Sequence, residues 1–157
     1  CPFCERYFQQ VEPSLISQYV NTGKAKFVWK DYAFLGPEST WAAEAARCAN
    51  DQGKFWAYHD YLYNHQGKEN SGAFSKANLK KFAGALGLNT AQFNTCLDTD
   101  KYASLVQQET QAGSAIGVNG TPATFINGQL VADGAGNSVG AAPFTTFQAV
   151  IDKLLGK

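Results

Sequence analysis

The chain opens with the stretch Cys1-Pro2-Phe3-Cys4, on which the predicted fold and chemistry both depend. Proline is favourable at the first position of an α-helix, because its missing N–H group would have no partner there. The spacing of the two cysteines places both sulfur atoms within one helical turn, so they can close a small ring. Cys1 falls at the helix N-terminus, where free N–H groups and the helix dipole stabilise a thiolate. The stretch therefore predicts a redox pair, because the thiolate is the form that attacks disulfides.

Within such a pair Cys1 is the expected nucleophile and Cys4 the expected resolving thiol. Two other uses of the Cys-x-x-Cys spacing stay open. A zinc site needs two more ligands, usually a second close pair, whereas Cys48 and Cys96 stand apart from each other. A purely structural bridge between Cys1 and Cys4 is the second alternative. With two histidines and no carboxylate cluster at ligand spacing, we expect neither a metal nor a cofactor.

Outward from this stretch, the sequence predicts a helix and a strand, then a block of helices, then a hairpin and a last helix. Residues 24–34 are rich in the aromatic and β-branched residues typical of strands. Asn127-Gly128 is a strong signal for a two-residue hairpin turn. The expected elements are helices over 3–22 (kinked near Pro13), 38–50, 54–65, 76–86, 90–97, 101–116 and 144–154, and strands over 24–34, 122–126 and 129–132. This order indicates an α/β core interrupted by a helical insertion.

The composition restricts the classes of function. The 157 residues correspond to about one domain, and 45% hydrophobic with 17% charged residues is an ordinary globular composition. Lysine plus arginine number 13, as do aspartate plus glutamate, so the net charge is zero. Nucleic-acid grooves and surfaces for anionic membranes need an excess of positive charge, which argues against both. No apolar run reaches the length of about 18 residues that a spanning helix needs.

The sequence contains no methionine at any position, and its first residue is a cysteine. We expect from this that the chain is not a primary translation product, so that either a leader was removed or the sequence begins inside a longer protein.

The motifs together resemble the DsbA-like thioredoxin-fold oxidoreductases of the bacterial cell envelope. The matching residues are Cys1-Pro2-Phe3-Cys4, residues 42–49 (AAEAARCA) with 53–56 (GKFW) and 59–60 (HD), and residues 117–128 (GVNGTPATFING). The resemblance covers nearly the whole chain. A Cys-x-x-Cys pair, a helical insertion and Gly-Thr-Pro-x-x-Phe-x-Asn-Gly in that order are highly specific to this family.

This resemblance implies a single DsbA-like domain over residues 1–157 with a thioredoxin-like α/β fold. Its core would comprise residues 1–36 and 118–157, and its helical insertion residues 37–117. The resemblance also implies that Thr121-Pro122 is a cis peptide facing the cysteine pair. In the family the backbone before this proline pairs with an extended substrate segment, so Thr121 and Pro122 are the expected substrate-binding residues.

The same resemblance implies that something is missing from the core. In the thioredoxin-like fold the middle strand of the sheet runs directly into the Cys-x-x-Cys helix, whereas here nothing precedes Cys1. The predicted strands at 26–33 and 123–126 would both pair with that strand and not with each other. We therefore expect the functional protein to have upstream residues that include a strand just before Cys1.

Cys48 and Cys96 both fall on predicted helices of the insertion. In an oxidising compartment they are expected to form one structural disulfide. Two separate buried thiols, or a second redox pair that shuttles electrons, are the alternatives. Among the remaining candidates, His59 lies on an apolar helix face and is expected to be a core histidine. Lys30 and Asp31 are expected to be charges at a strand end, with a buried charged pair as the alternative.

The sequence thus predicts an extracytoplasmic thiol–disulfide oxidoreductase of the bacterial periplasm or cell envelope, working as a monomer and most naturally as a disulfide donor. Anchoring to a membrane through a segment before Cys1 is an alternative for its location. Its expected partners are cysteine-containing client proteins and a redox partner that reoxidises or reduces the cysteine pair. A disulfide reductase or isomerase is the alternative within the enzymes. A non-catalytic peptide-binding module, in which the pair is a stable bridge, is the alternative outside them.

Overall fold

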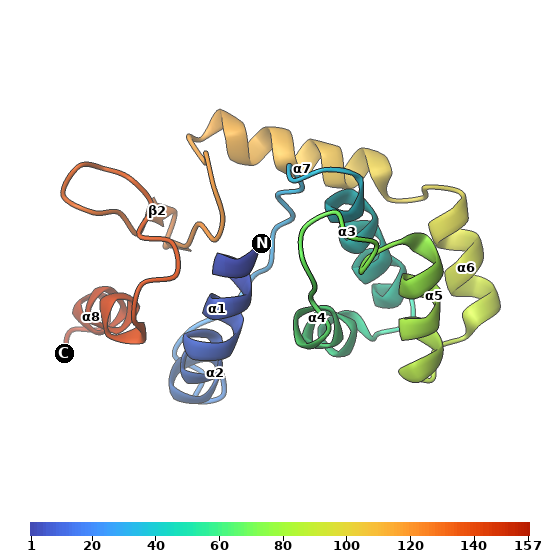
Figure 1. Ribbon diagram of the computed structural model, residues 1–157. Helices are drawn as coiled ribbons and strands as arrows, with labels where there is room; N and C mark the ends of the chain where they lie inside the picture. Colours follow the sequence, from blue (N-terminus) through green and yellow to red (C-terminus); the bar gives the residue numbers. More distant parts are fainter. The chain divides into compact units, whose positions relative to one another are not determined.

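The computed structural model describes residues 1–157, which form two compact units (Figure 1). One unit, which we call the core unit, comprises Cys1–Trp29 and Ile116–Lys157. The other, the helical unit, comprises Lys30–Ala115. None of the helices combines the length and the apolar character that crossing a membrane requires.

The secondary structure is mostly helical, with one small sheet. Along the chain the elements are α1 (Pro2–Gln10), α2 (Glu12–Leu15), the π-helical turn η1 (Ile16–Val20), α3 (Pro37–Asn50), α4 (Phe55–Asn64), α5 (Lys76–Ala85), α6 (Thr90–Asp98), α7 (Ala103–Ala115), β1 (Phe125–Ile126), β2 (Gln129–Leu130) and α8 (Phe144–Leu154). The predicted order of elements is therefore found, with the exception of the strand at 24–34.

The first predicted helix is divided into α1, α2 and η1 in the structure. The division falls at Val11, just before Pro13, which has no N–H group to continue the helical hydrogen bonds. The N–H of Val11 still bonds to the carbonyl of Tyr7 at 2.9 Å, and that of Leu15 to the carbonyl of Val11 at 3.1 Å. The chain thus keeps one helical direction through the proline, and its apolar stripe continues across the break.

The core of the core unit forms between this stripe, α8 and the hairpin. Its buried residues are Tyr7, Val11, Leu15, Tyr19, Val131, Phe147 and Ile151. The first four recur at every fourth position, which places them on one helical face. The Tyr7 ring meets the Phe147 ring edge-on at 5.5 Å, and the Tyr19 hydroxyl donates to Asp152 at 2.8 Å. These contacts fix α8 against the helix that carries the cysteine pair.

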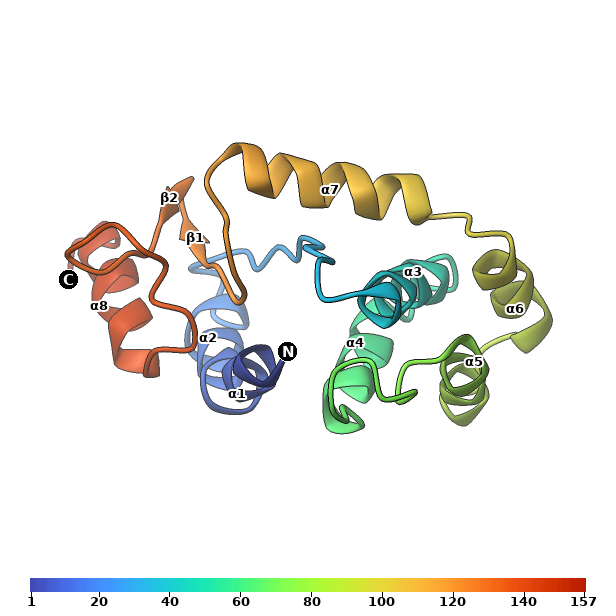
Figure 2. The ribbon, with the colours of Figure 1, turned by 45° about the horizontal axis from the view of Figure 1, so that its top comes forward.

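The hairpin β1–β2 is antiparallel, with Phe125 opposite Leu130 and Ile126 opposite Gln129 (Figure 2). Asn127 and Gly128 form its turn with φ angles of 49° and 80°. Positive φ at both central residues is the requirement of the hairpin turn for which Asn-Gly is favoured. The hairpin predicted from this dipeptide is therefore found, with shorter strands than expected.

The strand predicted at 24–34 is wrong, because residues 25–34 belong to no strand and do not pair with β1. A strand needs a neighbouring backbone to bond with. Here side chains of α7 accept hydrogen bonds from some of the N–H groups of this segment. The N–H of Asp31 donates to Glu109 Oε2 at 2.8 Å, and that of Ala33 to the Thr110 hydroxyl at 3.0 Å. Aromatic and β-branched content alone could not reveal that alternative pairing.

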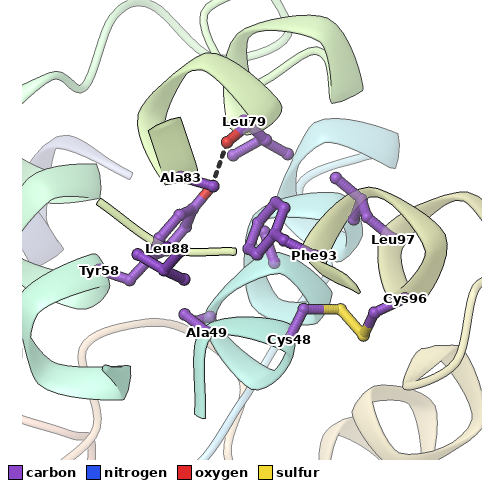
Figure 3. Packing of buried hydrophobic residues seen from close by; sticks show 11 residues of the cluster. Cys48, Ala49, Tyr58, Leu79, Ala83, Leu88, Phe93, Cys96 and Leu97 are labelled. Carbon is purple, nitrogen blue, oxygen red and sulfur yellow. Dashed lines mark hydrogen bonds between the residues drawn. A yellow bond between two sulfur atoms is a disulfide. The ribbon is translucent and has the colours of Figure 1, made fainter. Parts of the chain in front are cut away.

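The helical unit is built around α3, which contacts α4, α5, α6 and α7. Its alanines allow this close approach, since Ala45, Ala46 and Ala49 are buried within the core. Figure 3 shows Tyr58 and Phe93 packed side by side in that core, with ring centroids 5.3 Å apart. The Tyr58 hydroxyl donates to the carbonyl of Leu79 at 2.8 Å. The Tyr58 hydroxyl therefore has a hydrogen-bond partner within this apolar core.

Candidate active site

The cysteine pair lies at the start of α1. Cys1 is the N-cap residue and Pro2 occupies the first helical position, as the sequence predicts. The carbonyl of Cys1 accepts a hydrogen bond from the N–H of Glu5 at 3.1 Å. Cys4 lies within the same first turn; both cysteines are partly exposed, and neither is in a disulfide. The pair is thus a dithiol at a helix N-terminus, where the positive end of the dipole favours a thiolate.

Thr121 contacts Cys1 although 120 residues separate them in sequence. The thiol of Cys1 lies 3.5 Å from the Thr121 carbonyl oxygen, and the Thr121 hydroxyl donates to Cys1 Sγ at 3.4 Å. The peptide bond between Thr121 and Pro122 is cis. The structure therefore brings Cys1, Thr121 and Pro122 together at one place.

Two hydroxyl groups that the sequence analysis missed support the loop that carries Pro122. Ser138 donates to the Pro122 carbonyl at 3.2 Å and accepts from the N–H of Gly140 at 3.2 Å. Thr124 donates to the Tyr7 hydroxyl at 3.3 Å. The cis-proline loop is thus tied both to α1 and to the loop after the hairpin.

Tyr7 could have been found from the sequence, because a spacing of three residues places it on the same helical side as Cys4. Ser138 has no local signal, since its contact with Pro122 depends on how the loop after β2 returns. Burial raises the pKa of Tyr7 above its ordinary value of 10.0; the hydrogen bond from Thr124 opposes this shift, and the charge of Glu12 adds to it. Tyr7 is therefore neutral at physiological pH and acts as a hydrogen-bonding group.

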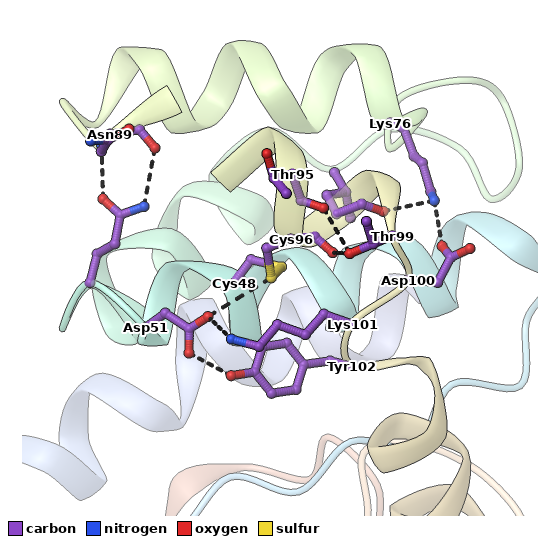
Figure 4. The surroundings of a disulfide bond; sticks show 12 residues. Cys48, Asp51, Lys76, Asn89, Thr95, Cys96, Thr99, Asp100, Lys101 and Tyr102 are labelled. Atoms are coloured by element: carbon purple, nitrogen blue, oxygen red, sulfur yellow. Dashed lines mark hydrogen bonds and ion pairs between the residues drawn. A yellow bond between two sulfur atoms is a disulfide. The ribbon is translucent and has the colours of Figure 1, made fainter. Parts of the chain in front are cut away.

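Cys48 and Cys96 form a disulfide between α3 and α6, with Cα atoms 5.9 Å apart (Figure 4). Cys48 is 1% exposed and Cys96 is 7% exposed, and both belong to the apolar core of the helical unit. Asp51 lies beside the bridge, with Oδ2 3.9 Å from Cys96 Sγ and 2.7 Å from Lys101 Nζ. An open hollow of about 680 Å³ borders these residues.

Ionisation of Asp51 is favoured in this environment. Burial acts against the charged form, but the hydrogen bonds from Lys101 and Tyr102 outweigh it and hold the pKa of Asp51 below its usual value. The disulfide therefore has a carboxylate on its exposed side and apolar residues on the other.

His59 is buried, with 2% exposure, and Nδ1 lies 3.0 Å from Asp60 Oδ1. Burial lowers the pKa of His59, although the contact with Asp60 opposes the shift. Asp31 pairs with Arg47 at 2.8 Å and Lys30 with Glu109 at 3.0 Å. These ion pairs connect the segment after Trp29 to α3 and α7.

A protein-family model matches nearly the whole chain. The family model described as Thioredoxin matches residues 1–153.

Two relatives illustrate the range of proteins in which similar sequences occur. The Na(+)/H(+) antiporter NhaA 3 of Salinispora tropica is 32% identical over 131 residues, which cover 82% of this chain and 19% of the antiporter. The chain thus spans about a fifth of the length of that relative. The probable disulfide bond formation protein D of Bacillus anthracis is 25% identical over 162 residues, which cover 100% of this chain and 70% of the relative.

Among solved structures, oxidised BdbD from Bacillus subtilis superposes with a TM-score of 0.86 at 21% identity. The match covers 100% of this chain and 83% of that chain. The two chains therefore share a fold, which confirms the architecture that the sequence predicts.

Proposed function

This chain belongs to the thioredoxin family, and we propose that it is a DsbA-like thiol–disulfide oxidoreductase whose redox pair is Cys1 and Cys4. The contacts of Thr121 with Cys1 Sγ, at 3.4 and 3.5 Å, are the observation that carries this proposal. They bring a hydroxyl donor and a backbone carbonyl to one sulfur of the pair. A purely structural bridge would need neither.

The proposed direction is disulfide donation. A client thiolate attacks Cys1 Sγ in the oxidised pair, a mixed disulfide forms, and Cys4 leaves as a thiolate. A second client thiolate then attacks the client sulfur of that mixed disulfide and releases the Cys1 thiolate. The client loses two electrons and gains a disulfide, while Cys1 and Cys4 become the dithiol. A redox partner must then reoxidise the pair.

Thr121 and Pro122 are the proposed substrate-binding residues. The carbonyl of Pro122 is occupied by Ser138, and that of Thr121 faces the Cys1 thiol. The N–H of Thr121 makes no hydrogen bond within the chain, and the residue is partly exposed. It can therefore bond with the backbone of an extended client segment while Cys1 exchanges with the client sulfur. Since backbone pairing is indifferent to side chains, we propose a broad range of cysteine-containing clients.

We propose an extracytoplasmic location, because the Cys48–Cys96 disulfide and a disulfide-donating pair both need an oxidising compartment. The relative named as a probable disulfide bond formation protein supports the same class of chemistry. We propose that the chain acts as a monomer, since the cysteine pair and Thr121 come from one chain.

Two assays on one sample test the function: reduction of insulin by a dithiol, and oxidation of a reduced model peptide. Donation predicts that peptide oxidation is the faster activity. Cys1→Ser should abolish both, whereas Cys4→Ser should accumulate mixed disulfides that are visible on non-reducing gels. Full exchange by the Cys1→Ser variant would contradict the assigned nucleophile. Faster insulin reduction would support the reductase or isomerase alternative.

The non-catalytic module is the alternative from another class. It predicts that the oxidised pair resists reduction by a glutathione buffer, whereas a catalytic pair equilibrates with that buffer. A titration with glutathione redox buffers, read by alkylation of Cys1 and Cys4, separates the two.

A further inference from the structure

The loop that leads from α7 into the cis-proline bond contains the dipeptide Asn119-Gly120. Asn119 is exposed, and neither residue makes a hydrogen bond in the structure. A Cβ atom built on Gly120 would meet no atom within 4 Å, so the space around its backbone is open. The dipeptide can therefore change conformation without breaking a hydrogen bond of its own.

An asparagine followed by glycine is the sequence with the least steric hindrance to succinimide formation. The backbone nitrogen of the glycine attacks the side-chain Cγ of the asparagine, the Cγ–amide bond breaks, and ammonia leaves. Water then opens the ring at either carbonyl and yields aspartate or isoaspartate. No electrons are exchanged, and water is the only co-reactant. The attacking nitrogen must be without a hydrogen bond and the surrounding space must allow the backbone to rotate, and the open surroundings of Gly120 meet these requirements.

We propose that Asn119 is a self-modification site, converted by water to aspartate and isoaspartate, and that this conversion slows thiol–disulfide exchange. The second half rests on the proposed function, whereas the first half does not.

A second Asn-Gly dipeptide in the same chain serves as an internal comparison. Asn127 and Gly128 are held at φ angles of 49° and 80° between the paired residues of β1 and β2. The change of backbone needed for ring closure would have to open that hairpin. Other asparagines are held by their side chains: Asn89 caps α6, Asn137 bonds with Asp133, and Asn70 donates to the carbonyl of Leu35.

The position of Asn119 explains why its conversion would matter. Consecutive Cα atoms are about 3.8 Å apart, so the Cα of Asn119 lies within roughly 7.6 Å of that of Thr121. Isoaspartate inserts an additional carbon into the backbone there and displaces Thr121 from Cys1. Both products also add a negative charge, and a like charge nearby disfavours the Cys1 thiolate.

The experiment ages the purified chain at neutral pH and 37 °C, with the cysteine pair returned to one redox state before each assay. Chymotryptic cleavage after Phe125 separates Asn119 from Asn127, so mass spectrometry follows each conversion on its own peptide. Isoaspartate is confirmed by enzymatic methylation. We expect conversion at Asn119 to be at least about tenfold faster than at Asn127, because opening the hairpin carries an added free-energy cost.

Gly120→Ala is the matched variant. Its Cβ meets no neighbouring atom, so the fresh protein should exchange disulfides at the parent rate, while ring closure is hindered and ageing is slowed. Asn119→Asp supplies the negative charge without the extra backbone carbon. It should therefore lower the exchange rate less than ageing lowers that of the parent protein. Asn127→Ser should lose its exchange activity on ageing at the same rate as the parent protein.

Each half of the proposal has its own contradicting result. Equal conversion of Asn119 and Asn127, or faster conversion of Asn127, would overturn the modification site whether or not the chain is an oxidoreductase. Conversion of Asn119 without a parallel loss of exchange would overturn the coupling. If the fresh protein shows no exchange at all, the proposed function fails and the mass data still decide the chemistry.

Discussion

The hydroxyl of Thr121 donates a hydrogen bond to Cys1 Sγ at 3.4 Å. A hydrogen bond to the charged form of a group stabilises that form, so the donor favours the Cys1 thiolate. In Thr121→Val the shape is kept and the donor is lost. We expect the pKa of the Cys1 thiol to rise in this variant, because its thiolate loses the hydrogen bond that Thr121 donates.

The measurement is the ultraviolet absorbance of the thiolate as a function of pH, in a Cys4→Ala background that leaves one titrating thiol at the site. Thr124→Val is the matched control, because the Thr124 hydroxyl bonds to Tyr7 and not to sulfur. An unchanged Cys1 titration in Thr121→Val would show that the Thr121 hydroxyl does not stabilise the thiolate.

At this scale, local signals in the sequence identify some residues of the site and not others. Pro2 after Cys1 indicates the helix start, because its preference is intrinsic to the residue. Ser138 is different: it holds the Pro122 carbonyl from 16 residues away, through a loop whose path no local preference determines. Contacts of this second kind could be known only from the structure.

Among the elements, the segment at 30–33 shows how one helix can replace a strand as a hydrogen-bonding partner. Glu109 of α7 accepts from the N–H of Asp31 at 2.8 Å and pairs with Arg47 at 2.7 Å. The apolar and aromatic pattern of this segment favours a strand, but the pattern says nothing about which neighbour is present. The prediction failed there because a strand forms its backbone hydrogen bonds with a second strand, whereas a helix forms them within its own segment.

Glu109→Gln tests how much this carboxylate contributes to the free energy of unfolding. Burial acts against its charged form, but the Asp31 N–H, Lys30 and Arg47 outweigh it and hold the pKa of Glu109 below its ordinary 4.5. A lowered pKa in the folded chain means stability that is present above about pH 4.5 and lost as the pH falls through the folded value. We expect Glu109→Gln to cost about 1 to 2 kcal/mol at pH 7 and much less near pH 3.

Urea unfolding at the two pH values provides the measurement. Lys30→Gln is the control, because Lys30 also pairs with Glu109 but its side chain is 72% exposed. Its loss should cost less than about 0.5 kcal/mol at either pH. A difference between Glu109→Gln and the parent that stays constant with pH would indicate a packing effect and not a charge effect.

At the scale of the whole molecule, the two cysteine pairs have different expected roles: one in stability and the other in exchange. Cys1 and Cys4 are partly exposed thiols, whereas the Cys48–Cys96 bridge lies in an apolar core and closes a loop with a sequence separation of 48. In the chain-entropy account, a loop of this length contributes about 4 kcal/mol to the free energy of unfolding. A bridge with that role should matter for folding and not for exchange.

We therefore expect the double variant Cys48→Ala with Cys96→Ala to lose a few kcal/mol of unfolding free energy, on the order of 2 to 4, yet to keep its rate of thiol–disulfide exchange at 25 °C. Urea unfolding and peptide oxidation, measured on the same preparation, supply the two values. The single variants are poorer tests, because each leaves a buried thiol that can form wrong disulfides with Cys1 or Cys4. If exchange falls while the double variant is still fully folded, the bridge also takes part in electron transfer, as the second redox pair left open by the sequence would. If stability is unchanged, helix packing around α3 alone holds the unit together, and the bridge has no structural role.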